Sequence, residues 1–176
     1  MSNKNKIGIL VGVVFLFGIF SWMFTAPYLG NEGLARTPGI IIGGTASPAP
    51  EDFTALSPPP PFPLMMKQAG FPPFVIYLSW AATTDGVITA THPDGAFWAQ
   101  RIRDNGGDGW LRIGDATYEM EAVEIFGDER LDMMLQWADA VGLTIDDSLY
   151  EGGAPLREFE VFYWTPRRPI KHFKLS

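Results

Sequence analysis

The longest uninterrupted apolar stretch lies near the N-terminus, over residues 7–24 (IGILVGVVFLFGIFSWMF), and contains no charged side chain. A helix of about 18 to 20 such residues crosses the roughly 30 Å of hydrocarbon in a bilayer. The pattern therefore predicts a transmembrane helix over 7–28, in which Trp22 and Tyr28 reach the far lipid–water interface. The competing interpretation is a cleaved signal peptide, whose apolar core is usually shorter.

The charges on either side of this stretch predict its orientation. Lys4 and Lys6 precede it, whereas Glu32 and Arg36 follow it. Because basic residues accumulate on the cytoplasmic side of membrane helices, residues 1–6 are predicted to be a cytoplasmic stub. The rest of the chain then lies outside the cytoplasm, which in a Gram-negative cell is the periplasm.

Residues 29–73 are rich in proline, glycine and small polar residues, which interrupt any helical or strand period. Pro58 to Pro61 favour polyproline II, so this segment is predicted to be an extended tether that reaches tens of ångströms from the bilayer. It also carries apolar side chains that a free linker does not need, namely Ile40, Ile41, Ile42, Phe53, Leu56, Phe62, Leu64, Met65 and Met66. Either the domain itself or a neighbouring subunit is expected to cover them.

Short β-rich runs and helical patterns fill residues 74–166, which predicts one small α+β domain. Strands over 74–80 and 86–91 are expected to form a hairpin, and strands over 110–113 and 117–124 a second one. In the last of these strands apolar and charged residues alternate, so one face is buried and the other is wet. The apolar set is Tyr118, Met120 and Ala122, and the charged set is Glu119 and Glu121.

Two helices and a final strand complete the predicted domain. Asp94 is expected to cap a helix that runs to about Asp104, with Trp98 and Ile102 on its apolar face. A second helix opens at Asp128 and stops before Gly142. Its predicted apolar face comprises Leu131, Met134, Leu135, Ala138 and Val141. In the last strand, over 159–166, Phe159, Val161 and Tyr163 alternate with Glu160 and Phe162.

Three passages carry a family resemblance. The first is Trp98, Ile102, Arg103 and Asn105; the second is Ala122, Gly127, Glu129 and Arg130; the third, looser, is Val161, Phe162 and Pro166. In this order, residues 74–166 resemble the deazaflavin-dependent nitroreductase family, relatives of the FMN-binding pyridoxamine phosphate oxidases. The resemblance implies a split β-barrel and a site for FMN or a deazaflavin near the first helix, with Trp98, Arg101 and Arg103 as cofactor contacts.

The sequence departs from this family at the motif that would bind the cofactor phosphate. A G-R-K-S-G motif precedes the first matching strand in the family, whereas here Pro58 to Pro73 contains Lys67 as its only cation. Arg101 stands where the family has an asparagine. Each charged hydrogen bond to a phosphate is worth about 1.5–3 kcal/mol, so losing the motif removes several kcal/mol of binding. The sequence therefore predicts a degenerate member of the fold that binds no cofactor, with flavin or deazaflavin binding as the alternative.

Composition and charge exclude several kinds of function. The chain has no cysteine and only two histidines, His92 and His172, so a thiolate site or a multi-histidine metal site is not expected. Its net charge of −7 divides into +2 for residues 1–36 and −9 for the remainder. A surface this acidic repels phosphate backbones, which argues against nucleic acid as a partner.

Aromatic and basic residues near the C-terminus suggest contact surfaces. Residues 167–176 form a basic tail that either is simply solvated or touches anionic lipid or an acidic partner. Five of the six tryptophans fall in the domain, and aromatic residues are enriched at interfaces. The side chains predicted to contact the bilayer or other subunits are Trp22, Tyr28, Phe62, Met65, Met66, Tyr163, Trp164, Arg167 and Arg168.

These features favour a membrane-anchored, non-enzymatic accessory subunit that uses tether, aromatic face and tail to grip a larger membrane complex, respiratory or photosynthetic among the candidates. The first alternative is a membrane-anchored oxidoreductase that uses flavin or deazaflavin, with substrate near Trp98 and Arg101. The second is an extracytoplasmic sensor of a small apolar ligand. Bound flavin would distinguish the first alternative from the accessory subunit.

Overall fold

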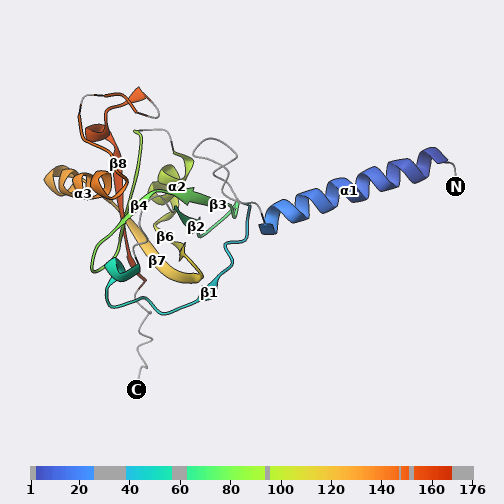
Figure 1. The fold of residues 1–176 in the computed structure, drawn as a ribbon, viewed down its shortest axis with the longest axis horizontal. Coiled ribbons are helices and arrows are strands. Elements are labelled where there is room, and N and C mark those ends of the chain that lie inside the picture. Colours follow the sequence, from blue (N-terminus) through green and yellow to red (C-terminus); the bar gives the residue numbers. More distant parts are fainter. Residues whose placement is uncertain are drawn as a thin grey trace, which may run out of the picture.

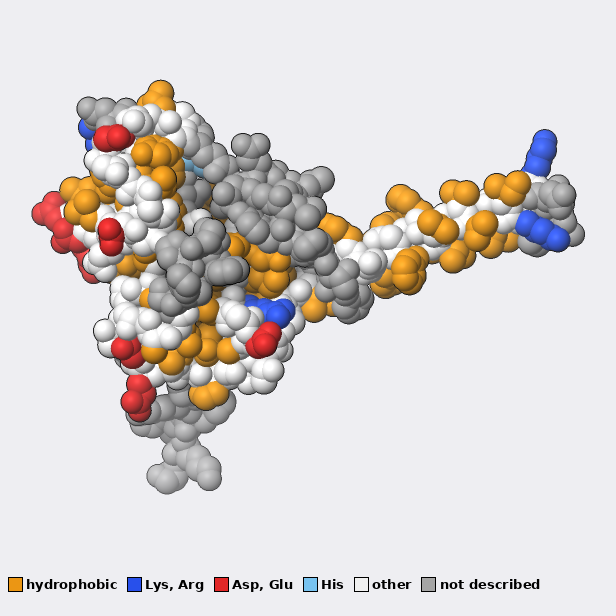
Figure 2. Space-filling model, viewed as in Figure 1, with side chains coloured by type: hydrophobic (Ala, Val, Ile, Leu, Met, Phe, Trp, Pro, Cys, Tyr) orange, Lys and Arg blue, Asp and Glu red, His pale blue; other side chains and the backbone are white. Residues whose placement is uncertain are grey.

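A single helix, α1 (Asn3–Thr25), stands apart from a small α+β domain in the computed structural model (Figure 1). The structure describes residues 3–25, 39–56, 63–93, 96–146, 148–150 and 153–167. The helix is long and apolar enough to span a membrane, a property that it shares with signal sequences, and none of its window Lys4–Trp22 is buried. Hydrophobic side chains cover its visible face in Figure 2.

In the residues that the structure describes, the domain is built on one sheet of eight strands. They are β1 (Thr45–Ala46), β2 (Leu64–Gln68), β3 (Val75–Leu78), β4 (Trp80–Ala82), β5 (Val87–Thr91), β6 (Asp108–Ile113), β7 (Ala116–Ile125) and β8 (Glu160–Pro166). The main path is antiparallel and runs β3-β2-β6-β7-β8-β5-β4, while β1 pairs in parallel with the start of β7.

The strand order forces the sheet to curl. β3 and β4 occupy opposite ends of the order, yet only Ser79 separates them along the chain. Two end strands joined by one residue are close in space only if the sheet between them bends round. The result is a curled half-barrel, which agrees with the barrel-like part of the sequence prediction.

Two helices pack on this sheet and define two hydrophobic cores. Helix α2 (Phe97–Asn105) closes the inside of the curl, where Trp98 and Ile102 join a core with residues from most of the strands. Helix α3 (Gly127–Ala140) lies across β4, β5 and β8 and builds the second core, together with the short 3-10 helix η4 (Leu156–Glu158). Since Trp98 and Ile102 are both buried, the expected apolar face of α2 is confirmed.

The β6–β7 hairpin forms as the sequence predicts. Tyr118, Met120 and Ala122 are buried, whereas Glu119 and Glu121 are exposed. The first predicted hairpin is correct only in part. The run 74–80 breaks at Ser79, so that Trp80–Ala82 pairs with β5 while Val75–Leu78 pairs with β2.

The predicted apolar face of α3 needs correction. Leu131 and Leu135 are 42% and 52% exposed, because Trp137 takes their place on the buried face beside Met134. In β8 both sets of alternating residues contain buried side chains, Val161 in one core and Phe162 in the other, since the strand is covered on both sides. Helix α2 begins at Phe97, and its predicted cap, Asp94, lies outside the described residues.

Much of the predicted tether belongs to the domain. Strand β2 lies inside the sheet, between β3 and β6, with Leu64 and Met66 both 1% exposed. Upstream, the 3-10 helix η2 (Phe53–Leu56) places Phe53 in the first core. The domain itself, and not a neighbouring subunit, therefore covers these apolar side chains, because the curled sheet offers them a complementary surface that no local pattern reveals.

Candidate functional site

Helix α2 carries the three side chains for which the sequence predicts cofactor contacts. Trp98 points into the first core, where its ring meets Phe162 edge-on at 4.8 Å between centroids. Arg101 and Arg103 flank this buried face on opposite sides. Their partners decide what chemistry the helix can support.

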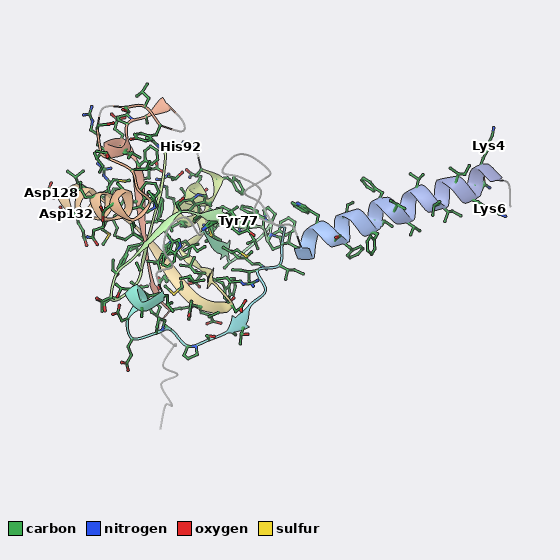
Figure 3. All side chains as sticks on the ribbon, in the orientation of Figure 1. Lys4, Lys6, Tyr77, His92, Asp128 and Asp132 are labelled. Carbon is green, nitrogen blue, oxygen red and sulfur yellow. The ribbon has the colours of Figure 1, made fainter. Side chains whose placement is uncertain are left out.

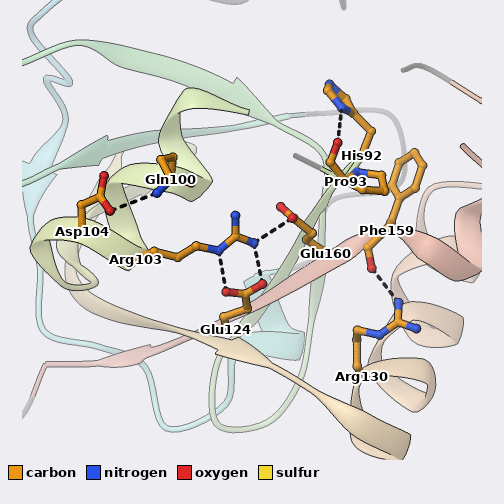
Figure 4. Close-up of polar contacts among 9 residues, drawn as sticks. All are labelled: His92, Pro93, Gln100, Arg103, Asp104, Glu124, Arg130, Phe159 and Glu160. Atoms are coloured by element: carbon orange, nitrogen blue, oxygen red, sulfur yellow. Dashed lines mark hydrogen bonds and ion pairs between the residues drawn. The ribbon is translucent and has the colours of Figure 1, made fainter. Parts of the chain in front are cut away.

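Arg103 is the centre of an ion-paired cluster between α2, β7 and β8 (Figure 4). Its Nε donates to Glu124 at 2.8 Å, and its Nη2 contacts a carboxylate oxygen of Glu124 at 2.5 Å and one of Glu160 at 2.8 Å. The guanidinium also lies 5.7 Å from the Phe162 ring. The hydrogen bonds to Glu124 raise the pKa of Arg103, so the cation keeps its charge.

The two glutamates of this cluster were not singled out as site residues from the sequence, but a signal for each of them exists. Glu124 continues the buried alternation of Tyr118, Met120 and Ala122 along β7. A carboxylate that falls on a buried face needs a cation, and Arg103 is that cation. Glu160 shares its face of β8 with the buried Phe162, and the same reasoning applies.

The Arg101 side chain is almost fully buried, at 5% exposure, and its guanidinium donates hydrogen bonds to backbone carbonyls. Its Nη1 donates to Pro72 O at 2.6 Å and its Nη2 to Ala69 O at 2.9 Å. The guanidinium also stacks near the rings of Phe74 and Phe97, at 5.0 and 5.9 Å from their centroids. Arg101 is therefore a clamp on the loop that precedes β3.

The neighbouring Gln68 adds a second link between β2 and α2. This side chain is 4% exposed, and its Nε2 donates to Trp98 O at 2.7 Å. Among the residues that the structure describes, its Oε1 has no hydrogen-bond partner, which is an unusual state for a buried amide oxygen. The amide thus helps to fix the height of α2 above the sheet.

As they are placed, Arg101 and Arg103 do not fit a flavin phosphate. A phosphate needs convergent donors that face open space, whereas Arg101 bonds to internal carbonyls and Arg103 to two carboxylates. Within the described ranges, no three His, Asp or Glu side chains are grouped so as to hold a metal ion. The two arginines of α2 therefore act as links between structural elements.

A second polar arrangement fixes the chain upstream of the sheet. Residues 39–47, here called the strap, run from Gly39, which pairs with Val75 of β3, to Thr45–Ala46, which pair with β7. Three side chains donate to its carbonyls: Lys67 Nζ to Ile40 at 2.9 Å, Arg112 Nη1 to Ile42 at 3.0 Å and Thr117 Oγ1 to Gly43 at 2.7 Å. The backbone bond from Val75 N to Gly39 O, at 2.8 Å, secures its start.

An open cleft of about 350 Å³ lies beside the strap. It is lined by Leu56, Pro63, Met65, Tyr77, Arg112, Ile113 and Gly114. Met65, Tyr77 and Arg112 are cross-strand neighbours on β2, β3 and β6, so one row of the sheet forms its floor. Arg112 is engaged there by the strap and by Gly114 O at 2.9 Å.

The predicted contact residues that the structure describes are exposed, half-buried or buried. Trp22 is 42% exposed on α1, and Arg167 is exposed and pairs with Asp108 at 2.8 Å. Met65 and Tyr163 are half-buried, and the Tyr163 hydroxyl lies 2.8 Å from Thr83 Oγ1.

Two of the predicted contacts are instead core residues. Met66 is 1% exposed and Trp164 is 0% exposed, because both lie inside the curl, where the Trp164 indole donates to Thr89 at 3.0 Å. Neither side chain is accessible to a partner. Tyr28, Phe62 and Arg168 lie outside the described residues.

Comparison with protein-family models found no match, and a search of curated proteins found none either. The resemblance to the nitroreductase family therefore stays a prediction. What the chain does has to be argued from its own residues.

Proposed function

We propose that this protein is a membrane-anchored, non-enzymatic accessory subunit of a larger membrane protein complex. The observation that carries the proposal is α1, whose apolar window of 19 residues has no buried side chain. At 1.5 Å per residue this window is about 29 Å long, close to the thickness of the bilayer hydrocarbon. An apolar helix that does not pack against its own domain has a low free energy only in lipid or against an apolar surface of another protein.

The ends of α1 support a defined orientation for the anchor. Lys4 and Lys6 lie at the end that points away from the domain (Figure 3). Under the positive-inside rule this end faces the cytoplasm, and the domain is extracytoplasmic. The carboxylates of α3, such as Asp128 and Asp132, lie on the side of the domain that is remote from α1.

The engagement of the charged side chains supports a structural over a catalytic role. Arg101 clamps a loop, Arg103 joins three elements, and Lys67 and Arg112 hold the strap. Each of these cations stabilises the domain or its attachment to the anchor. A scaffold that transmits a membrane attachment needs such links, whereas a cofactor site needs donors that remain open.

The anchor is tested first by its resistance to extraction. Phe15 lies in the middle of α1 and is 69% exposed. We expect Phe15→Arg to release the protein on alkaline washing of membranes, while the matched variant Phe15→Leu stays bound. The intact mass of the membrane-bound protein should be the full 19.5 kDa. A shorter protein that begins after the apolar helix would show a cleaved signal peptide instead.

The accessory role is tested by extraction in mild detergent through an affinity tag. We expect a colourless protein that carries other membrane subunits in a fixed ratio, and Phe15→Arg should lose them. A yellow protein, or one that binds added flavin or deazaflavin with micromolar affinity, would favour the oxidoreductase. Purification of the intact membrane protein alone, under conditions that preserve other complexes, would contradict the proposal.

A further inference from the structure

The domain displays an aromatic surface that its own fold does not cover. Phe71 is 90% exposed and Phe97 is 59% exposed, and the ring of Phe97 meets that of the half-buried Phe74 at 5.4 Å. We call Phe71, Phe74 and Phe97 the Phe71 patch. Exposed apolar groups of this kind mark contacts with proteins or membranes.

The Arg101 side chain fixes the loop that carries Phe71. Arg101 donates to Ala69 O on one side of Phe71 and to Pro72 O on the other. The same guanidinium stacks on Phe74 and Phe97. The exposed ring is therefore presented on a fixed backbone, so little backbone ordering remains to oppose its binding.

The Phe71 patch lies where the chain enters the domain from the anchor. Gly39 pairs with Val75, the residue directly after Phe74. Only residues 26–38 separate Gly39 from the end of α1 at Thr25, and a chain of this length spans at most about 50 Å. Figure 1 shows the end of α1 on the side of the domain where β3 lies. The pairing of Gly39 with Val75 thus limits the distance between this side of the domain and the end of α1 to at most about 50 Å.

The charge distribution favours the same orientation. The exposed carboxylates of α3, Asp128 and Asp132, lie on the opposite side of the domain from α1 (Figure 3). Acidic side chains also gather on that side in Figure 2. With the Phe71 patch towards the membrane, these carboxylates are held away from anionic headgroups.

We infer that the Phe71 patch inserts into the headgroup region of the bilayer that α1 spans. The inference rests on the proposed membrane anchor. The two protruding rings, Phe71 and Phe97, suit a fluid lipid phase, which needs no complementary pocket, better than they suit a preformed protein surface. The patch and α1 then hold the domain at two points, which fixes its tilt as well as its distance.

The chain has no cysteine, so single substitutions give unique sites for a fluorescent probe. The sites are Phe71→Cys, Phe97→Cys, Val14→Cys in α1, and Phe126→Cys as the matched control. Phe126 is also an exposed phenylalanine, at 70%, but it lies beside α3. The full chain is placed in nanodiscs of phosphatidylcholine, with and without phosphatidylglycerol, and the probe is quenched by nitroxide lipids or by aqueous iodide.

We expect nitroxide lipids to quench probes at residues 14, 71 and 97 several-fold more than the probe at residue 126, and iodide to do the reverse. The probe at 126 controls for the probe's own affinity for lipid. If residue 14 contacts lipid but residues 71 and 97 are as open to iodide as 126, the inference fails and the anchor stands. Shielding of residues 71 and 97 from both quenchers would also overturn it, in favour of a protein contact.

If the probe at residue 14 stays in water, the anchor itself fails, and the inference fails with it. Because the Phe71 side chain is 90% exposed, its replacement removes almost no packing within the domain. The variant labelled at residue 71 should therefore unfold at the same denaturant concentration as the unlabelled protein. A second variant provides an independent reading, since Phe71→Ser should increase the access of iodide to a probe at residue 97.

Discussion

Replacement of Phe53 by alanine tests whether the segment before the sheet is part of the folded domain or a free tether. Phe53 is 1% exposed in the first core, and its ring meets Tyr118 of β7 edge-on at 5.9 Å. The backbone around it is attached to the sheet as well, since Phe53 N donates to Thr84 O at 3.1 Å. In a free tether none of these contacts would exist.

The expected loss follows from the burial of the ring. A fully buried phenylalanine truncated to alanine usually costs about 3–5 kcal/mol, because apolar contacts are lost and a cavity remains. The Tyr118 contact on one side of the ring places Phe53→Ala within this range. For a domain of this size, the loss corresponds to a fall of roughly 10–20 °C in melting temperature.

The matched control is Ile41→Ala in the strap. Ile41 is also apolar and also precedes the sheet, but it is 41% exposed. Its truncation should cost less than about 1 kcal/mol. The measurement is denaturant unfolding of the full chain in detergent micelles, followed by the emission of the buried tryptophans Trp98 and Trp164.

A free energy of unfolding for Phe53→Ala within about 0.5 kcal/mol of the wild-type value would refute this reasoning. It would mean that residues 39–56 leave the domain at little cost. The bound on the distance between domain and membrane would then no longer hold. Equal losses for Phe53→Ala and Ile41→Ala would instead show that the effect does not follow burial.

Two further predictions concern the links within the domain. Arg103→Met and Glu124→Gln, made singly and together, should give a coupling energy of about 1–2 kcal/mol, because the pair is bidentate and only partly exposed; a value near zero would show that solvent screens it. Gly107→Ala should destabilise the domain by about 2–3 kcal/mol or more, since a Cβ there would clash with the carbonyl oxygen of Ala122. Gly114→Asn, in an open turn with a φ of 61°, should change stability little, and an equal loss at both glycines would contradict this account.

The parts of the fold that the sequence predicts well are those that a local period describes. The alternation of Tyr118, Met120 and Ala122 gives both the strand and its buried face, and the glycine and aspartate between β6 and β7 give the turn. Trp98 and Ile102, four residues apart, give the apolar face of α2. In each case the neighbours that matter are within a few residues along the chain.

The predictions that fail depend on neighbours that are distant in sequence. The run 74–80 has one continuous β pattern, and only the pairing with β2 and β5 shows that it divides at Ser79. Leu131 has the right spacing for the buried face of α3, but the sheet beneath meets Trp137 instead. Periodicity indicates which residues share a face and not which face the partner element covers.

The candidate site shows the same division. The sequence predicts that Arg101 and Arg103 lie beside the apolar face of α2, and in the structure both arginines lie there. It does not show that Arg101 faces the carbonyls of Ala69 and Pro72, because that contact joins residues about thirty positions apart. The prediction of surface roles for Met66 and Trp164 fails for a related reason, since large apolar residues fit an interface and a core equally well.

The sequence by itself determines that this chain carries an apolar helix long enough to cross a bilayer, an acidic α+β domain and a basic C-terminal end. Length, composition and charge are properties of the chain before it folds, so no contact is needed to read them. Only the tertiary structure decides that the supposed tether joins the sheet, that the two arginines of α2 are engaged internally, and that Phe71 remains outside. These outcomes depend on the curl of the sheet, which sets distant residues against one another and leaves other residues exposed.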